Sequence, residues 1–300
     1  MFDYLRQRMK AQRKAYLFAF LSIACWSTIG SAFKISLRYI EPLPLLLFST
    51  LLACLVLFSI LLIQGKSGLL KNISIKDILI SSFLGLLNPF LYYMVLLKAY
   101  NLLPAQEAGT LNYIWPLFLV LLSIPMLKQK ISFWSIVAIL ISFSGIFIIS
   151  THGELYSLHF TSLPGVALAV GSAVFWALYW IFNVKDQREA VSKLFLNFCF
   201  GFLYTLIAVI LAGDFSLPLW RGISGAIYIG FFEMGITFVL WINALKYSAT
   251  TAKVSNLIYL SPFFSLIIIH FTVGETILIS TVTGLFFIVC GIILQQYLKR

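Results

Sequence analysis

The chain has 300 residues, of which 61% are hydrophobic and only 10% are charged. Soluble domains carry about 25% charged residues, so this composition excludes a soluble globular protein and leaves lipid as the solvent for most of the chain. The net charge of +11 could suggest a nucleic-acid partner. However, the basic residues follow the loops between apolar segments, which is typical of a topology signal, and we expect no nucleic acid to bind.

Ten apolar segments follow a basic N-terminal segment, residues 1–14. Because a helix needs about 20 apolar residues to cross a bilayer, the chain predicts an all-α integral membrane fold of ten transmembrane helices. The first apolar run is too long for the core of a signal peptide, so we expect it to remain as an anchor. The predicted spans are residues 15–34, 43–63, 78–98, 105–127, 131–149, 164–183, 193–212, 222–244, 252–271 and 278–298.

Lys and Arg lie mainly in alternate loops. The loops on the side of the N-terminus carry 16 of them and the opposite loops carry four, with Lys253 set aside inside the ninth span. The positive-inside rule therefore predicts a multi-pass protein of the cytoplasmic (inner) membrane with both termini in the cytoplasm. The same basic loops have affinity for anionic lipid, which makes the bilayer an expected partner.

The two halves of the chain are similar. When Pro116 is aligned with Pro262, Tyr113 falls on Tyr259. Five spans per half is an odd number, so the second half enters the membrane in the opposite orientation, and this inverted repeat is typical of alternating-access carriers. The predicted units are a first five-helix repeat, an extracytoplasmic linker and a second five-helix repeat, at 15–149, 150–163 and 164–298.

Pro116 and Pro262 interrupt the fourth and ninth predicted spans. Each proline removes one i→i−4 hydrogen bond and strands a carbonyl, that of Asn112 or Ile258. In a bilayer such a carbonyl is buried in protein or faces a polar cavity. Interrupted helices at matching positions in two halves indicate a transporter's binding site. We therefore predict a small-solute site where these helices meet, with the two breaks as gating points.

Three charged residues lie at or near membrane depth. Glu233 is near the middle of the eighth span, where an ionised acid costs about 2.5–3.5 kcal/mol on insertion scales. It is therefore a candidate proton site or a partner for a substrate ammonium. The alternative is a structural acid that is held by hydrogen bonds. Glu107, in the first turn of the fourth span, is explained by the helix dipole or is a charge partner. Lys253 is placed to snorkel to the interface or to bind a carboxylate.

Aromatic side chains in the spans are the other candidates for the site. An indole N–H or phenol O–H in hydrocarbon needs an acceptor, so some of these groups are expected to face the interior, although aromatics at helical spacing also serve packing. Tyr113 and Trp115 directly precede a helix break, and Tyr259 precedes its counterpart. The candidate substrate-binding set is Trp26, Tyr92, Asn112, Tyr113, Trp115, Trp176, Tyr179, Trp180, Glu233, Trp241 and Tyr259.

Signals for an enzyme are absent from the sequence. It has no Walker loop, no HExxH and no GxSxG pattern, and its three histidines are scattered. The four cysteines fall in apolar segments without metal-ligand spacing, as small buried hydrophobes do. We therefore expect no catalytic residues, no metal site and no cofactor.

The chain resembles the ten-helix EamA-type exporters of the drug/metabolite transporter superfamily over nearly its whole length. The residues that carry the resemblance are GITFVLWINAL at 235–245 and, closest to the bacterial aromatic amino-acid exporters, WST at 26–28, NYIWP at 112–116 after Glu107, WALY at 176–179 and YLSP at 259–262. The resemblance implies a central cavity lined by the first, third, fourth, sixth, eighth and ninth spans. Glu233 and the tyrosines of the third span depart from that subgroup.

The expected function is secondary transport that exports amino acids, aromatic or hydrophobic ones, by alternating access. A carrier of another small metabolite, such as a polar amino acid or a nucleotide-like anion, is the alternative within the same class. A non-transporting membrane scaffold is the alternative outside it, although a scaffold has no reason to keep two matching helix breaks. We expect a monomer or a weak homodimer with a small-molecule substrate.

Overall fold

The computed structural model describes residues 2–127, 133–154, 161–214, 219–248, 254 and 256–297, and every regular element within them is helical. The first half contains α1 (Phe2–Ser36), α2 (Pro42–Ile63), η1 (Ser67–Asn72), α3 (Ile75–Gly85), η2 (Leu86–Leu91), α4 (Tyr92–Leu102), α5 (Ala105–Asn112), α6 (Trp115–Leu127) and α7 (Phe133–Ser150). The second half contains α8 (Leu163–Lys185), α9 (Ala190–Ala212), α10 (Trp220–Tyr228), η3 (Ile229–Thr237), α11 (Phe238–Tyr247), η4 (Asn256–Leu260), α13 (Ser261–Val273) and α14 (Ile279–Tyr297).

Apart from η1, which lies between the second and third predicted segments, and the start of α1, which extends into the basic N-terminal segment, the described helices follow the ten predicted segments. The all-α membrane fold expected from the sequence is confirmed. Six helical stretches among the described residues are long and apolar enough to cross a membrane. They are the first three segments of each half: Ala11–Ser36, Pro42–Ile63, Ile75–Leu102, Leu163–Lys185, Ala190–Ala212 and Trp220–Tyr247. The fourth and ninth segments are interrupted, which divides them into shorter pieces.

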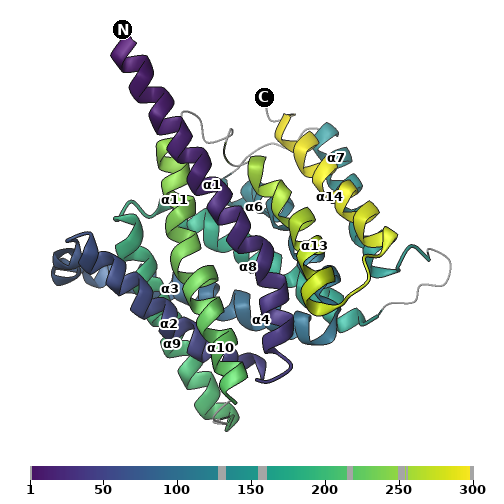
Figure 1. The fold of residues 1–300 in the computed structure, drawn as a ribbon, viewed down its shortest axis with the longest axis horizontal. Helices are drawn as coiled ribbons and strands as arrows, with labels where there is room; N and C mark the ends of the chain where they lie inside the picture. The colour runs from purple at the N-terminus through teal and green to yellow at the C-terminus, as the bar shows by residue number, and fades with distance from the viewer. Residues whose placement is uncertain are drawn as a thin grey trace.

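Helices of each half pack against helices of the other half across the bundle (Figure 1). In the first half, α1 packs against α13 and α11, while its counterpart in the second half, α8, packs against α6 and α4. Likewise α2 packs against α9, and α7 against α14. Each contact between the halves thus recurs with the halves exchanged, which is what two repeats of the same five-helix plan require. The start of α1 and the end of α14 lie toward the same end of the bundle (Figure 1).

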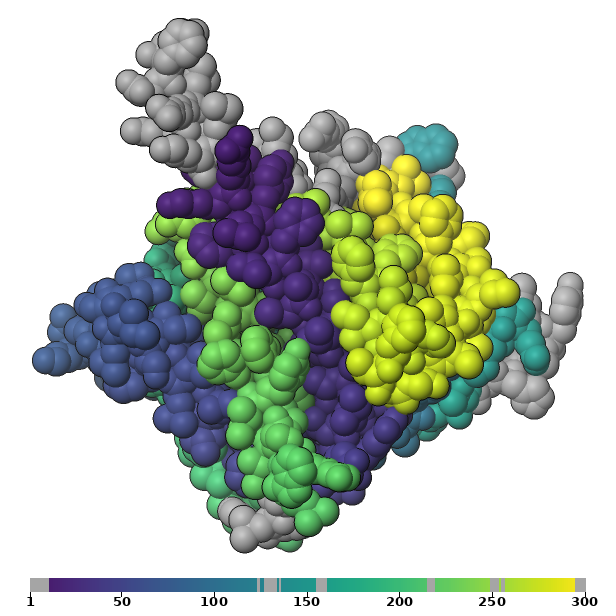
Figure 2. All heavy atoms as spheres, viewed as in Figure 1, coloured from purple at the N-terminus to yellow at the C-terminus, as the bar shows by residue number. Residues whose placement is uncertain are grey.

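The helices α7 and α14 form a close pair at one side of the bundle, where α14 supplies the yellow surface in Figure 2. Glycines let their backbones touch, since a methyl group on Gly145 would meet the carbonyl oxygen of Gly284, and one on Gly291 would meet that of Ala138. Small residues at such contacts are a typical device of helix association in membranes. Beyond each other, the two helices contact the rest of the described bundle mainly through α5.

The third and eighth segments each contain a π-helical stretch, η2 and η3, at equivalent places in the two halves. Asn88 in η2 has an extended backbone (φ −148°, ψ 121°) just before Pro89, and Glu233 lies in η3. The Thr237 hydroxyl donates to the Phe232 carbonyl oxygen, five residues back. Such π-bulges are rare in proteins as a whole, but they are often found at functional sites. The wider turn places backbone groups and side chains in positions that a regular helix does not offer.

Candidate functional site

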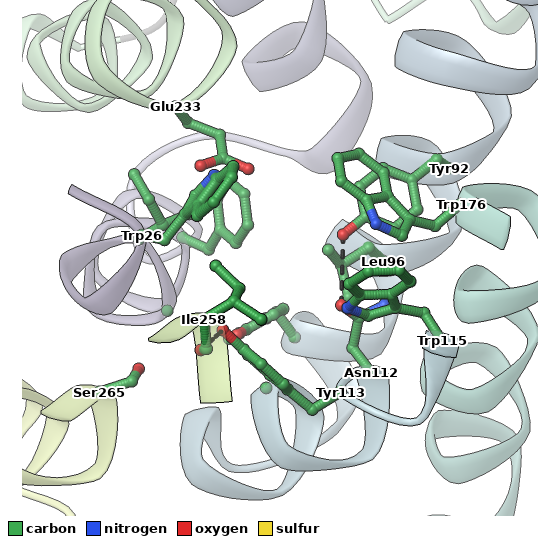
Figure 3. Close-up of a pocket in the computed structure, with 15 residues that line it drawn as sticks. Trp26, Tyr92, Leu96, Asn112, Tyr113, Trp115, Trp176, Glu233, Ile258 and Ser265 are labelled. Carbon is green, nitrogen blue, oxygen red and sulfur yellow. Dashed lines mark hydrogen bonds between the residues drawn. The ribbon is translucent and has the colours of Figure 1, made fainter. Parts of the chain in front are cut away.

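A cavity of about 100 Å³ lies where the repeats meet. Its walls come from α1, α4, the α5–α6 region, α8, η3, η4 and α13, which belong to the six spans that the resemblance implies. Figure 3 shows the side chains that line it. They are Trp26, Ile29, Gly30, Phe33, Tyr92, Leu96, Tyr100, Gly109, Asn112, Tyr113, Trp115, Trp176, Glu233, Ile258 and Ser265.

The α4 wall follows from helical spacing. Tyr92, Leu96 and Tyr100 are four residues apart and therefore share one face of the helix. The Tyr100 hydroxyl fits beside two glycines, because a methyl group would come within 2.8 Å of it on Gly109 and within 3.1 Å on Gly30. Small residues on α1 and α5 thus admit a large polar side chain from α4. Sequence reasoning missed Tyr100, whose only signal was its position two helical turns after Tyr92.

The interruption of the fourth span lies at residues 113–114, between the end of α5 and the start of α6. The Tyr113 amide donates to the Gly109 carbonyl at 3.3 Å and to that of Thr110 at 3.2 Å, so the helix ends in a loose turn. The turn directs Asn112, Tyr113 and Trp115 to the cavity. Asn112 is fixed there, because its Oδ1 accepts from the Tyr92 hydroxyl at 3.2 Å and its Nδ2 donates to Ser172 Oγ at 2.8 Å.

The interruption of the ninth span faces that of the fourth. The 3₁₀ helix η4 runs directly into α13, whose first turn contains Pro262. The Ile258 carbonyl, predicted to be stranded by this proline, accepts a long hydrogen bond of 3.5 Å from the Tyr113 hydroxyl. Tyr113 therefore links the two interrupted helices. Lys253 lies outside the described residues.

Glu233 brings a carboxyl group to the cavity (Figure 3). The residue is only 5% exposed. Its Oε1 accepts a hydrogen bond of 2.8 Å from the Tyr93 hydroxyl of α4, while its Oε2 has no partner among the described residues. A carboxyl oxygen buried without a partner is costly, so Oε2 is the cavity atom with the strongest demand for a hydrogen-bond donor.

Aromatic rings form the wall opposite Glu233 (Figure 3). The Trp176 ring is 4.6 Å from that of Tyr92 and 6.4 Å from that of Trp115, between ring centroids. On the other side, Trp26 packs edge-on against Trp241 at 5.3 Å. The cavity therefore presents the carboxyl group of Glu233 on one side and the faces of several aromatic rings on the other.

The remaining predicted aromatics lie outside the cavity lining. Trp180 and Tyr179 pack behind Trp176, with ring centroids 5.9 and 6.2 Å from it. Trp241 packs behind Trp26, and Tyr259 is buried one residue after Ile258 of the lining. Trp180, Tyr179 and Trp241 thus pack against rings of the lining from outside the cavity.

Glu107 does not line the cavity. It is fully buried, and its Oε1 lies 2.5 Å from Nε2 of His152 and 3.2 Å from the Thr161 hydroxyl. The carboxylate that interacts with the N-terminal end of the α5 dipole is that of Glu275. It accepts hydrogen bonds from the amides of Ala105 and Gln106, at 2.7 and 3.1 Å. Sequence reasoning assigned no role to His152 or Glu275, since their partners are distant in the chain.

Lys34 completes the polar contacts at this end of the bundle. Its Nζ donates to the carbonyls of Tyr100 and Leu103, at 2.8 and 2.6 Å. These are orphan acceptors at the end of α4, where a cation is favourable. Lys34 and Glu275 thus tie α1, α4 and α5 to the α13–α14 connection.

At the opposite end of the bundle, the connection between α8 and α9 carries two ion pairs, one of them to Lys66 in the connection between α2 and η1. Arg188 contacts Asp186 at 2.7 Å, and Lys66 contacts Glu189 at 2.7 Å. Partial burial acts to raise the pKa of Asp186, but the hydrogen bonds and charge of Arg188 outweigh it and hold that pKa below its ordinary value. Burial also acts to raise the pKa of Glu189. The hydrogen bonds from Lys66 and the Ser192 amide outweigh it, so this pKa is lowered as well.

Among the described residues, no three His, Cys, Asp or Glu side chains come together to hold a metal ion. The side chains that line the cavity offer hydrogen bonding to a carboxyl, an amide and hydroxyls, together with stacking on aromatic faces. Such a site can bind and release a small organic molecule.

Comparison with known proteins points the same way. The family model described as "EamA-like transporter family" matches residues 13–151 and 163–295. Among curated proteins, the chain is 26% identical to "Uncharacterized transporter YvbV" of Bacillus subtilis, covering 96% of this chain and 93% of that protein. It is 25% identical to an "Uncharacterized transporter" of Clostridium kluyveri, covering 94% and 93%. One solved crystal structure matches with a TM-score of 0.66 and 21% identity, over 95% of this chain and 96% of that one.

Proposed function

The chain belongs to the EamA-like transporter family and is a secondary transporter, and we propose that it exports aromatic or other hydrophobic amino acids by alternating access. The observation that carries the proposal is the pairing of groups in the cavity. Oε2 of Glu233, which has no hydrogen-bond partner in the part of the chain that the structure describes, lies across the cavity from the rings of Tyr92, Trp115 and Trp176 (Figure 3).

This pairing is complementary to an amino acid with a ring. The substrate ammonium would donate to Glu233, in a charge-assisted hydrogen bond that is shorter and stronger than a neutral one. The Ile258 carbonyl, which accepts the long bond from the Tyr113 hydroxyl, offers a second acceptor. The substrate ring would stack on the aromatic wall, as rings do in offset or edge-to-face contacts.

The size of the cavity indicates that binding requires movement. At about 100 Å³, the cavity is smaller than the roughly 150 Å³ apolar cavity that accommodates benzene in a soluble protein. A substrate with an aromatic ring therefore needs the cavity walls to separate. Alternating access supplies that movement when one repeat rocks against the other around the site, and the breaks at Pro116 and Pro262 are the proposed gating points.

The proposed orientation has both termini in the cytoplasm of a cell whose inner membrane holds the protein, as the distribution of Lys and Arg favours. An alkaline phosphatase reporter fused after residue 300 is expected to be inactive, because that enzyme matures only outside the cytoplasm. An active fusion would contradict the proposed topology.

A second candidate substrate is an organic cation without a carboxylate. The cavity acid favours it as well, because among the described residues no Lys, Arg or His side chain lines the cavity to receive a carboxylate. Aromatic rings next to an acid also bind ammonium groups through cation–π contacts.

Uptake into proteoliposomes separates the two candidates. Radiolabelled tryptophan and tryptamine share the ring and the amine and differ only in the carboxylate, and a panel of polar amino acids and nucleotides covers the alternatives. We expect concentrative or exchange flux of tryptophan and related amino acids. Flux of tryptamine alone would favour the organic cation, and flux of neither would contradict the proposal.

A further inference from the structure

A second hollow, the α3–α8 groove, lies between α3 and the end of α8. Its volume is about 320 Å³, larger than that of the central cavity, with which it shares no lining residue. The α3 residues of its wall recur at helical spacing and so share one face of that helix. The lining is Leu79, Ile80, Phe83 and Leu84 of α3 with Phe182, Lys185 and Asp186 at the end of α8.

The groove exists because α3 and α8 are joined at only a few points. The main partners of α3 are α9 and η2, which leaves its face toward α8 largely uncovered. Arg188 ties the two helices together near the end of the bundle, where it donates to the Asp77 carbonyl at 3.2 Å and to Ser81 Oγ at 2.8 Å. The rings of Phe83 and Phe182 meet edge-on, with centroids 5.0 Å apart. These contacts hold the walls of the groove in place.

The groove extends from membrane depth to the membrane surface. Its α3 residues and Phe182 lie within helical stretches that are long and apolar enough to cross a bilayer, whereas Lys185 and Asp186 are at the very end of α8. Leu79 and Phe83 are 65% and 45% exposed, so the apolar part of the groove is open to lipid. An occupant that fits is apolar along most of its length and polar at one end.

The polar end of the groove offers a positive charge. Lys185 is exposed, with Nζ 5.8 Å from the centroid of the Phe182 ring, and it forms no ion pair with any residue that the structure describes. The carboxylate of Asp186 is already neutralised, because its two oxygens accept from Arg188 Nε at 3.0 and 3.1 Å. Asp77 lies 3.8 Å from the same guanidinium. The charge available to a ligand is therefore that of Lys185.

We propose that the α3–α8 groove binds an anionic phospholipid, with an acyl chain along the apolar wall and the phosphate at Lys185. Basic pockets between transmembrane helices are known binding sites for anionic lipid headgroups. A free phosphate would leave the apolar wall unused, and a neutral lipid would leave Lys185 without a counterion. The site is more specific than the attraction of basic loops for a charged membrane, since it fixes both the chain and the headgroup.

A lipid in this groove contacts both repeats. Its α3 wall belongs to the first half and continues through η2 into α4, which supplies Tyr92 to the central cavity, while its α8 wall belongs to the second half and carries Trp176. A ligand that binds the folded protein stabilises it by mass action. We therefore expect the bound lipid to stabilise the present spacing of α3 and α8, whatever substrate the transporter carries.

The position of the acyl chain can be mapped by photo-crosslinking. The probe is phosphatidylglycerol with a diazirine in one acyl chain, added to the detergent-purified protein, and the labelled peptides are identified by mass spectrometry. We expect label within residues 79–84 or at Phe182. Leu79→Trp should abolish this label by filling the groove, and its matched control is Leu55→Trp on α2, which is 55% exposed and outside the groove lining.

The headgroup is tested by native mass spectrometry of the same protein with phosphatidylglycerol and phosphatidylcholine of identical chains. The parent protein should bind phosphatidylglycerol about fivefold more tightly, which is the factor expected from one lysine near a membrane surface. Lys185→Gln should remove this preference. Lys71→Gln, which removes an exposed lysine of the neighbouring η1, should keep it.

Each outcome supports or contradicts the site. Label confined to other segments of the parent protein would exclude the groove, and this map decides the point even if Leu79→Trp fails to fold. Equal binding of the two lipids, or an equal loss of preference in Lys185→Gln and Lys71→Gln, would exclude the contact between the phosphate and Lys185. Displacement of the lipid by an equal concentration of glycerol 3-phosphate would exclude a role for the acyl chain. No substrate enters these measurements, so their failure leaves the proposed tryptophan flux untouched.

Discussion

Replacing Glu233 by glutamine tests the proposed contact with a substrate ammonium most directly. The glutamine keeps the shape of the side chain, and its Oε1 can still accept the hydrogen bond that the Tyr93 hydroxyl gives at 2.8 Å. What changes is the atom that faces the cavity, since Oε2, which has no described partner, becomes an NH₂ group. That group is a donor and cannot bind an ammonium.

The expected loss follows from the kind of bond that is removed. A hydrogen bond to a charged group contributes about 1.5–3 kcal/mol, and every 1.4 kcal/mol or so is a factor of ten in affinity. Glu233→Gln should therefore weaken tryptophan binding by roughly 10- to 100-fold. A charge pair at 4 Å in an effective dielectric of 20 has a Coulomb energy of about 4 kcal/mol, before the cost of taking both charges out of water is subtracted.

The assay is equilibrium binding of radiolabelled tryptophan to the detergent-purified protein. Glu41→Gln is the matched control, because Glu41 is exposed at the start of α2 and its side chain makes no cap hydrogen bond. Its affinity for tryptophan should equal that of the parent protein. Equal affinity in Glu233→Gln, with a retained fold, would refute the assignment of Oε2 to the substrate.

Three further predictions concern other parts of the molecule. Trp115→Ala should weaken binding of an aromatic substrate by about 10- to 100-fold in the same assay, since stacking of a base on an aromatic side chain is worth about 1–3 kcal/mol. Gly109→Ala should lower the melting temperature relative to Gly171→Ala, because the added methyl group meets the Tyr100 hydroxyl at 2.8 Å whereas Gly171 has open space, and overpacking costs about 1–3 kcal/mol. Asp186→Asn should lower stability at neutral pH and flatten its dependence on acid, because a carboxyl whose pKa is lowered by folding stabilises the protein above the unfolded pKa of about 3.9 and loses that contribution as pH falls through the folded pKa.

Each of these has an outcome that contradicts it. Unchanged affinity in Trp115→Ala would remove this ring from the site. Equal melting temperatures for the two glycine variants, which share the same gain in helix propensity, would show that Tyr100 moves away without cost. A melting temperature of Asp186→Asn that follows the parent protein from pH 7 to pH 3 would exclude the pairing with Arg188 as a source of stability.

The elements of the fold that the sequence predicts are those with a strong local cause. Length and apolar content determine the six long helices, and a proline inside an apolar segment determines the interruption before Pro116, which the structure places at residues 113–114. Lys193 shows the limit of counting charges by loop. The count of loop charges includes Lys193, the first residue of the predicted seventh span. The side chain is instead buried within α9, 9% exposed, and its ammonium donates to the carbonyls of Asn183 and Asp186.

What the sequence does not predict depends on contacts between distant segments. In the third segment Pro89 is a local signal for the break at Asn88. The π-helical stretch η3 has no such signal, so the position of Glu233 relative to Tyr93 could not be derived. Tyr100 enters the cavity only because glycines of α1 and α5 leave room for its hydroxyl. Asn88 and Asn197 lie more than one hundred residues apart, and only the packing of η2 on α9 brings both of them near Tyr179.

The close pairing of α7 and α14 offers a fixed reference for measuring motion. Backbone contact at Gly145 and Gly291 leaves these two helices little freedom to slide, and neither contributes a side chain to the cavity lining. A spin label or fluorophore on their outer face, which carries exposed apolar side chains such as Leu140 and Phe286, would report distances to labels on α8 or α11 without entering the site. Changes in those distances on addition of substrate could then be assigned to the helices that surround the cavity.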